Sequence, residues 1–313
     1  IGLAVCGMSN LFMSIFPPFA AMIIIWTFNA YAQSMLWSSV LCAVTSMYDK
    51  ETAKSRMSVM ITSVAAGNIL GIVVNTYLIT RFNVRFAFII PGLLTIALSI
   101  FTFIATKNIK NTQKSTAENT SRLAVLKDKE LIKMNIAAMI HGVMKENIGL
   151  WMAVYVVDTY FVDLRRSSYY ILLIPVIGFV GRFVYPALYK LCRNNENTVS
   201  LIGFAICIAE SILLCFGLGI IFSVLMLSVI YMAVSIINTS MLSIYPLSYS
   251  KTGNTASVSG IVDFSTYLGA GISSAVYGTV IKHFGYLPMF ASWGILSAAA
   301  FLIIRGINKR HNH

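Results

Sequence analysis

Charged side chains are scarce in this sequence. They make up 11% of its 313 residues, whereas 58% of the residues are hydrophobic. Soluble domains carry about 25% charged residues. The apolar side chains here exceed what one soluble core could bury, so lipid must cover the remainder. The composition therefore excludes a water-soluble globule and predicts a protein embedded in a bilayer.

Sequence motifs of common enzyme classes are missing as well. The chain contains no HExxH zinc motif, no GxSxG nucleophile motif and no Walker phosphate loop. Its four histidines are scattered, and its five cysteines show no CxxC spacing. We interpret the cysteines as small apolar residues of the spans rather than as metal ligands or disulfides. We expect no enzyme, no catalytic residue, no metal, no cofactor and no ATP-driven pump.

Long apolar runs dominate what is present. A membrane-spanning helix needs about 20 mostly apolar residues, and ten segments qualify. They are residues 1–16, 19–47, 57–78, 86–104, 131–156, 168–191, 200–218, 221–245, 257–281 and 287–304. The sequence therefore predicts an all-α membrane protein with ten spans.

The positive charges lie in short segments between these spans. The net charge of +12 could suggest a nucleic-acid partner, but this placement is typical of topology signals instead. If the long polar segment 107–130 lies inside, most of the 23 Lys and Arg residues also lie inside. The outer segments then keep only Arg81, Arg85, Arg165, Arg166 and Lys282. We therefore predict a multi-pass protein of the cell membrane with segment 107–130 and the C-terminus in the cytoplasm.

The long polar segment also predicts the domain organisation. We expect residues 1–106 to form the remainder of an N-terminal helical bundle and residues 107–130 to be a cytoplasmic linker. Residues 131–306 would form a six-helix bundle, followed by a tail over residues 307–313. Four spans before the linker and six after it suggest a six-plus-six protein of twelve spans that lacks its first two. A true ten-span protein is the alternative.

Several short stretches resemble one transporter family. They are residues 29–37 (NAYAQSMLW), 145–151 (KENIGLW), 253–260 (GNTASVSG), 267–271 (YLGAG) and the Gly285-Tyr286 pair. In their order and spacing they resemble spans four, seven, eleven and twelve of the organophosphate:phosphate antiporter family of the major facilitator superfamily. The resemblance implies a major-facilitator-type bundle in which this chain supplies spans three to twelve. The family's seventh-span Arg is Lys145 here.

Lys145 is the leading candidate for substrate binding. Asn135, Ala138, Gly142 and Gly149 recur with it at helical spacing and form a small, polar stripe. An ammonium group in such a stripe would attract an anion as a point charge, without the planar fork that Arg offers. An internal ion pair that holds two helices together is the alternative.

Besides Glu210, which we expect to pair with an adjacent span, three other ionisable residues lie at membrane depth, where charge is costly and needs a partner or a polar cavity. Glu146 lies about 100° around the helix from Lys145 and could carry a proton or pair with a neighbouring helix. Asp263 would form a salt bridge or mark a helix entry. Arg182 resembles part of the superfamily's basic loop between spans eight and nine. We expect these three residues to serve coupling or gating.

Uncharged polar residues complete the expected site. Asn29, Gln33 and Trp37 recur at i, i+4 and i+8, and Tyr231 and Asn238 share a polar face of the tenth span. The resemblance implies that the fourth, seventh and tenth spans line the substrate cavity. We therefore expect these residues to orient the substrate, although amides can also simply join helices.

These features bear on three functions. The first is a secondary active transporter that moves a small organic anion by alternating access, such as an organophosphate exchanged for phosphate or carried with protons. The second is a membrane sensor of the same family that binds ligand without transport. The third, an intramembrane enzyme, lacks a suitably placed catalytic pair. We expect the partners to be a small anionic substrate and the lipid bilayer, with no nucleic acid, and the protein to be a monomer.

Overall fold

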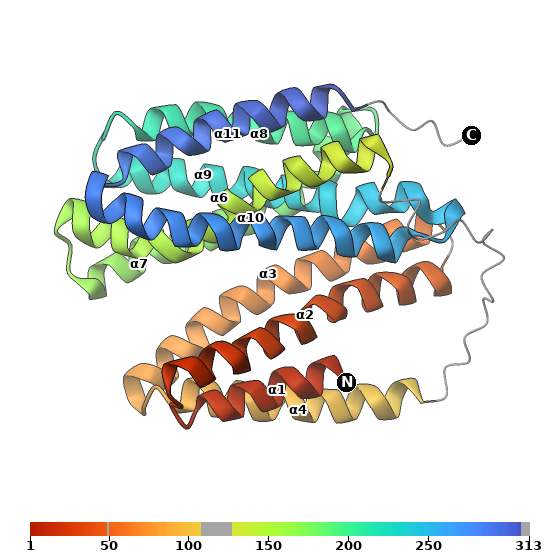
Figure 1. Ribbon diagram of the computed structural model, residues 1–313, viewed down its shortest axis with the longest axis horizontal. Coiled ribbons are helices and arrows are strands. Elements are labelled where there is room, and N and C mark those ends of the chain that lie inside the picture. The colour runs from red at the N-terminus through yellow and green to blue at the C-terminus, as the bar shows by residue number, and fades with distance from the viewer. Residues whose placement is uncertain (49, 108–126, 308–313) are drawn as a thin grey trace. The chain divides into compact units, whose positions relative to one another are not determined.

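The structure is a computed structural model that describes residues 1–48, 50–107 and 127–307. Over these residues the chain forms α-helices and no strand (Figure 1). The helices are α1 (Gly2–Met13), α2 (Phe19–Met47), α3 (Lys50–Arg81), α4 (Phe86–Thr106), α6 (Lys129–Tyr160), α7 (Leu164–Leu191), α8 (Glu196–Leu214), α9 (Ile220–Asn238), α10 (Thr255–Phe284) and α11 (Leu287–Arg305). Each overlaps one predicted span, so the all-α fold class is confirmed. Most of the predicted linker and the tail after residue 307 lie outside the described residues.

Fewer helices meet a strict criterion of length and hydropathy than the ten spans expected from the sequence. By length and composition, six helical stretches among the described residues are apolar enough to cross a membrane, including Phe86–Ala105 and Ile220–Ser250. Helices α6 and α10 are not among them, because polar and charged residues occur along both. The candidate site lies on α6 and α10, two of the helices that this criterion leaves out.

Several helix ends follow local rules of capping. The side chain of Asp128 accepts a hydrogen bond from the Glu130 N–H at the start of α6, and Asn195 caps α8 in the same way. Gly285, with φ of +74°, ends α10 in a backbone conformation that favours glycine. Pro17 and Pro18 separate α1 from α2. These short connections allow each helix to reverse direction and pack beside an earlier one.

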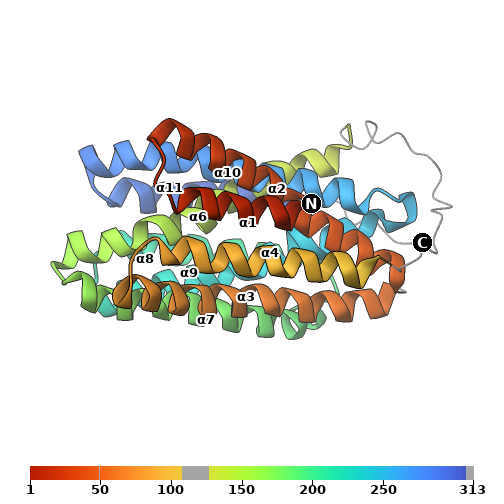
Figure 2. The same cartoon turned by 90° about the horizontal axis from the view of Figure 1, so that it is seen from below.

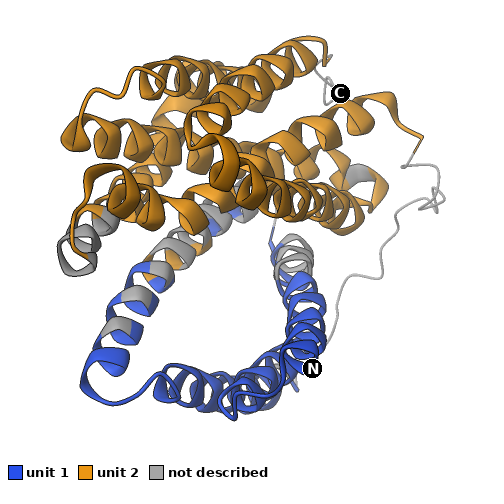
Figure 3. Cartoon of the chain, turned by 60° about the vertical axis from the view of Figure 1, so that its left-hand side comes forward, with its two compact units in different colours: residues 1–57, 67–116 blue, residues 58–66, 117–313 orange. Residues whose placement is uncertain are grey.

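The chain divides into two compact units (Figure 3). Unit 1 comprises residues 1–57 and 67–116, and unit 2 comprises residues 58–66 and 117–313. In unit 1, α1 packs against α2 and α4. A Cβ on Gly7 would lie 2.9 Å from the Gly92 carbonyl oxygen, so the absence of side chains lets α1 and α4 approach closely. The predicted domain boundaries remain a prediction.

Unit 2 is built from three tightly packed helix pairs (Figures 1 and 2). Helix α6 packs on α10, α8 on α11, and α7 on α9. Large side chains such as Trp293 and Phe204 are completely buried between these pairs. Apolar side chains on the outer faces stay exposed, as expected where lipid is the solvent.

The tenth predicted span is not a regular α-helix throughout. Helix α9 continues into a π-helical turn, η1 (Thr239–Ile244), and then a 3₁₀-helix, η2 (Tyr245–Thr252). Pro246 lies at the start of η2, where it lacks an N–H to donate. Short π segments inside helices often occur at functional sites.

Polar contacts tie α6 to the α9–η2 segment near both ends. Toward one end, the Tyr160 hydroxyl lies 2.7 Å from Ser223 Oγ, and the Tyr155 hydroxyl also contacts this serine at 3.3 Å. At the other end, the Tyr249 hydroxyl donates to Asp128 Oδ2 at 2.7 Å. The ends of these two segments are therefore fixed against each other within unit 2.

Candidate functional site

Lys145 lies in the middle of α6 beside acidic and aromatic groups. Its Nζ is 3.2 Å from Glu146 Oε1 and 4.9 Å from the centroid of the Tyr267 ring. The Lys145 side chain is 25% exposed and that of Glu146 is 42% exposed. The ammonium group is thus paired without being sealed from its surroundings. Its Tyr267 contact has the geometry of a cation–π interaction.

Helix α10 reaches Lys145 because two glycines remove the side chains between the helices. A Cβ on Gly142 would collide with the Thr266 carbonyl oxygen, and one on Gly269 would collide with the Met139 carbonyl oxygen. Small residues allow this close approach of backbones in membrane proteins. The close packing brings Asp263, like Tyr267, within electrostatic range of Lys145.

A hydrogen-bonded network joins α6 and α10 just after Lys145 in the sequence. Asn147 is completely buried, and its Nδ2 donates to Ser273 Oγ at 2.7 Å. Its Oδ1 accepts from Trp151 Nε1 at 3.1 Å and from Ser274 Oγ at 3.4 Å. The Trp151 ring lies against Gly278, 3.6 Å from where a Cβ would sit. This network sets the register of α6 against α10 and so holds Lys145 in place.

Tyr231 connects the Lys145 region to a second cation. Gly178 on α7 leaves room for the Tyr231 ring, which would otherwise collide with a Cβ there. The Tyr231 hydroxyl is within electrostatic range of both Arg182 and Lys145. Two predicted cations and two predicted acids, Glu146 and Asp263, therefore lie in one region of unit 2.

Asn238 is placed differently from Tyr231. It is the last residue of α9, directly before the π turn, and it lies seven positions after Tyr231. At 1.5 Å per residue they are about 10 Å apart along the helix. The Asn238 Oδ1 atom is buried and has no hydrogen-bond partner. A single small ligand bound at Lys145 would need to extend toward the π turn to reach it.

Sequence reasoning missed His141. Its side chain is completely buried one helical turn before Lys145, and its Nε2 lies 3.1 Å from the Val234 carbonyl oxygen of α9. The available signal was its spacing, since residues four apart share a helix face. A histidine facing a lysine across one turn of a span is not a scattered residue.

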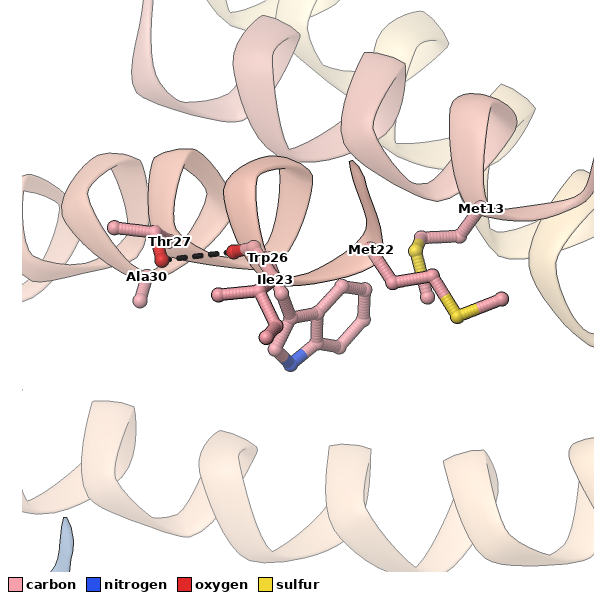
Figure 4. Close-up of a pocket in the computed structure, with 6 residues that line it drawn as sticks. All are labelled: Met13, Met22, Ile23, Trp26, Thr27 and Ala30. Carbon is pink, nitrogen blue, oxygen red and sulfur yellow. Dashed lines mark hydrogen bonds between the residues drawn. The ribbon is translucent and has the colours of Figure 1, made fainter. Parts of the chain in front are cut away.

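In unit 1, the predicted polar face of α2 splits between two environments. The Asn29 side chain is buried, with its Oδ1 unpartnered, whereas Gln33 is exposed. The Trp37 side chain lies outside the described part of the chain. An open pocket of about 480 Å³ occurs nearby, lined by Met13, Met22, Ile23, Trp26, Thr27 and Ala30 (Figure 4). None of these lining residues is charged, so the pocket does not suit an anion.

Comparison with known proteins identifies the fold. Two crystal structures of the transporter FucP align with 99% of this chain. One is described as a Major Facilitator Superfamily transporter in the outward conformation, at 15% identity, covering 82% of that chain with a TM-score of 0.75. The other is a variant of the E. coli fucose:proton symporter, at 16% identity, 83% coverage and a TM-score of 0.72. No curated protein sequence matches the chain.

Similarity to these structures shows the fold of the chain, and a family model shows the family to which it belongs. The model of the Major Facilitator Superfamily matches residues 1–274, which is most of the sequence. Together with the apolar helices, this match indicates a multi-pass membrane protein of a transporter family. The chain belongs to the Major Facilitator Superfamily.

Proposed function

We propose that this protein is a secondary active transporter of a small organic anion, with Lys145 as the group that attracts the anion. The observation that carries the proposal is the partly exposed Lys145 ammonium between Glu146 and the Tyr267 ring. A charged group within a span is costly unless it serves a site or a partner. Here the partner is the neighbouring Glu146, whose bond to Lys145 an incoming anion can replace.

The composition of the site supports a substrate that is small and singly anchored. Lys145 and Arg182 are balanced by Glu146 and Asp263, so the region has no large surplus of positive charge. An ammonium binds carboxylate and phosphate alike as a point charge, because it lacks the bidentate fork of Arg. The resemblance to organophosphate:phosphate antiporters makes a phosphate ester exchanged for phosphate one candidate, and a simple carboxylate another.

Transport would proceed by alternating access, in which the site opens to one side of the membrane at a time. Glu146, Asp263 and Arg182 are proposed for coupling or gating, because they surround the same region of unit 2 as Lys145 and Tyr231. Asn29, Gln33, Trp37, Tyr231 and Asn238 remain proposed substrate contacts. We propose that the cargo moves across the cell membrane, with the long segment 107–130 in the cytoplasm.

The test is counterflow in proteoliposomes loaded with inorganic phosphate, sugar phosphates, phosphoglycerates or simple carboxylates. We expect one of these anions to exchange, and Lys145→Ala to reduce its uptake roughly a hundredfold because the electrostatic anchor is lost. Lys282→Ala is the matched control, since it removes an equal charge at the exposed end of α10. Normal uptake by a correctly inserted Lys145→Ala protein would refute the role of Lys145. Ligand binding without any uptake would favour a sensor.

A further inference from the structure

His141 forms a side-chain bond to the backbone of another helix. Its imidazole is completely buried, and Nε2 lies 3.1 Å from the carbonyl oxygen of Val234. A carbonyl oxygen can only accept a hydrogen bond, so Nε2 carries the proton and donates it. The bond therefore joins α6, which carries Lys145, to α9, which carries Tyr231 and Asn238.

The carbonyl that His141 contacts has a special position in α9. In an α-helix, the carbonyl of residue 234 accepts the N–H of the residue four positions later, which is Asn238. Asn238 is the last α-helical residue, and the π turn begins at Thr239. A side chain that bonds within the backbone ladder is a recognised cause of local departures from α-helix. The imidazole thus contacts α9 in the last turn before the π-helical segment begins.

The other ring nitrogen makes the placement of His141 costly. Nδ1 is buried and has no hydrogen-bond partner. A buried acceptor without a hydrogen-bond partner is destabilising, whereas an apolar side chain at this position would avoid that cost. His141 also lies one turn from Lys145 and within its electrostatic range. A buried polar group that carries this cost needs an explanation, and an apolar side chain such as leucine could not donate a hydrogen bond to Val234.

We propose that His141 is a positioning residue of the substrate site. Its donor at Nε2 holds Val234 so that α9 passes into the π turn after Asn238, which fixes where Asn238 points relative to Lys145. The inference rests on the proposed transport function for its effect on substrate, but the structural link between His141 and the π turn does not depend on it. His141 acts through α9 and does not itself touch substrate.

Three substitutions separate the donor from the volume of the side chain. His141→Gln keeps an N–H donor at the distance of Nε2, His141→Asn is too short to reach Val234, and His141→Leu fills the space without a donor. Hydrogen exchange of the full chain without ligand is measured on peptides that cover residues 231–249. We expect exchange to rise roughly threefold to tenfold in the Asn and Leu variants, as for loss of one buried hydrogen bond, and to stay near wild type in the Gln variant.

Specific results would overturn this proposal. Equal exchange in the Asn variant and the wild type would show that the bond does not hold the π turn. Exchange as fast in the Gln variant as in the Asn variant would show that the donor is not the relevant group. If the Leu variant does not fold, the comparison of Gln with Asn still decides. His283→Leu, at the exposed end of α10, is the control and should leave this peptide unchanged.

Counterflow of inorganic phosphate tests the link to substrate. The Asn variant should raise KM roughly tenfold with little change in the maximal rate, and the Gln variant should restore KM. An unchanged KM in the Asn variant would refute a role in substrate positioning. If the wild-type protein moves no phosphate, the proposal that it exchanges phosphate fails. The hydrogen-exchange measurements on residues 231–249 still decide the role of His141 in α9.

Discussion

The contact between α6 and α10 gives the sharpest prediction, because two nearby glycines of α10 differ completely in their surroundings. A Cβ at Gly269 would collide with the Met139 backbone, whereas a Cβ at Gly271 would meet nothing within 4 Å. Gly269→Ala must therefore push two helix backbones apart, and overpacking of this kind costs about 3 kcal/mol at the upper end of its range. Both substitutions also gain about 1 kcal/mol of helix propensity. This gain cancels when the two variants are compared, which leaves a difference of about 3 kcal/mol.

The measurement is the temperature at which half of the detergent-solubilised protein remains monodisperse. For a chain of this size, about 3 kcal/mol corresponds to a midpoint difference of roughly 6 °C. We expect Gly269→Ala to melt lower than Gly271→Ala by about this amount. Gly142→Ala and Gly149→Ala form a second pair, because only the first would collide with α10. Equal midpoints within both pairs would refute the close packing that places Tyr267 and Asp263 beside Lys145.

Two further predictions concern the network around Asn147 and the sidedness of the protein. Asn147→Ala should lower the free energy of unfolding by about 1–3 kcal/mol, because Trp151 and Ser273 lose a buried partner; a midpoint equal to that of wild type would contradict the network. In a protein without its native cysteines, a single cysteine replacing Lys282 should react with an impermeant thiol reagent added to intact cells, while one placed within residues 107–130 should not. The reverse pattern of labelling would invert the predicted topology.

Most of the helices could be predicted from the sequence because their signal is strong and local. Long apolar runs separated by short basic segments leave few alternatives in a bilayer. The polar spans α6 and α10 fall below a plain hydropathy threshold, yet the small, polar stripe around Lys145 identified α6 as a helix with an unusual face. The π turn after Asn238 could not be predicted, because the hydrogen-bond register depends on contacts from another helix.

The site was harder to predict than the fold. The 100° between Lys145 and Glu146 suggested separate directions, but both side chains are long enough to meet at 3.2 Å. The i, i+4 pattern of Asn29 and Gln33 suggested one shared face, yet Asn29 is buried and Gln33 exposed. His141 was overlooked because its partner is a backbone carbonyl 93 positions later. Periodicity describes the direction of a side chain, whereas its contacts depend on neighbours that are distant in the chain.

The tenth span is hydrogen-bonded to α6 and its N-cap residue at three places, and this has a mechanical consequence. Ser223, Val234 and Tyr249 attach that span to α6 near one end, in the middle and near the other end. A span that is bound to α6 at three places cannot slide along it, and it can bend only between these places. The longer of the two intervening stretches, between Val234 and Tyr249, contains the π-helical turn η1 (Thr239–Ile244). Any bending of the tenth span should therefore concentrate at η1, and the rest of the span should move together with α6.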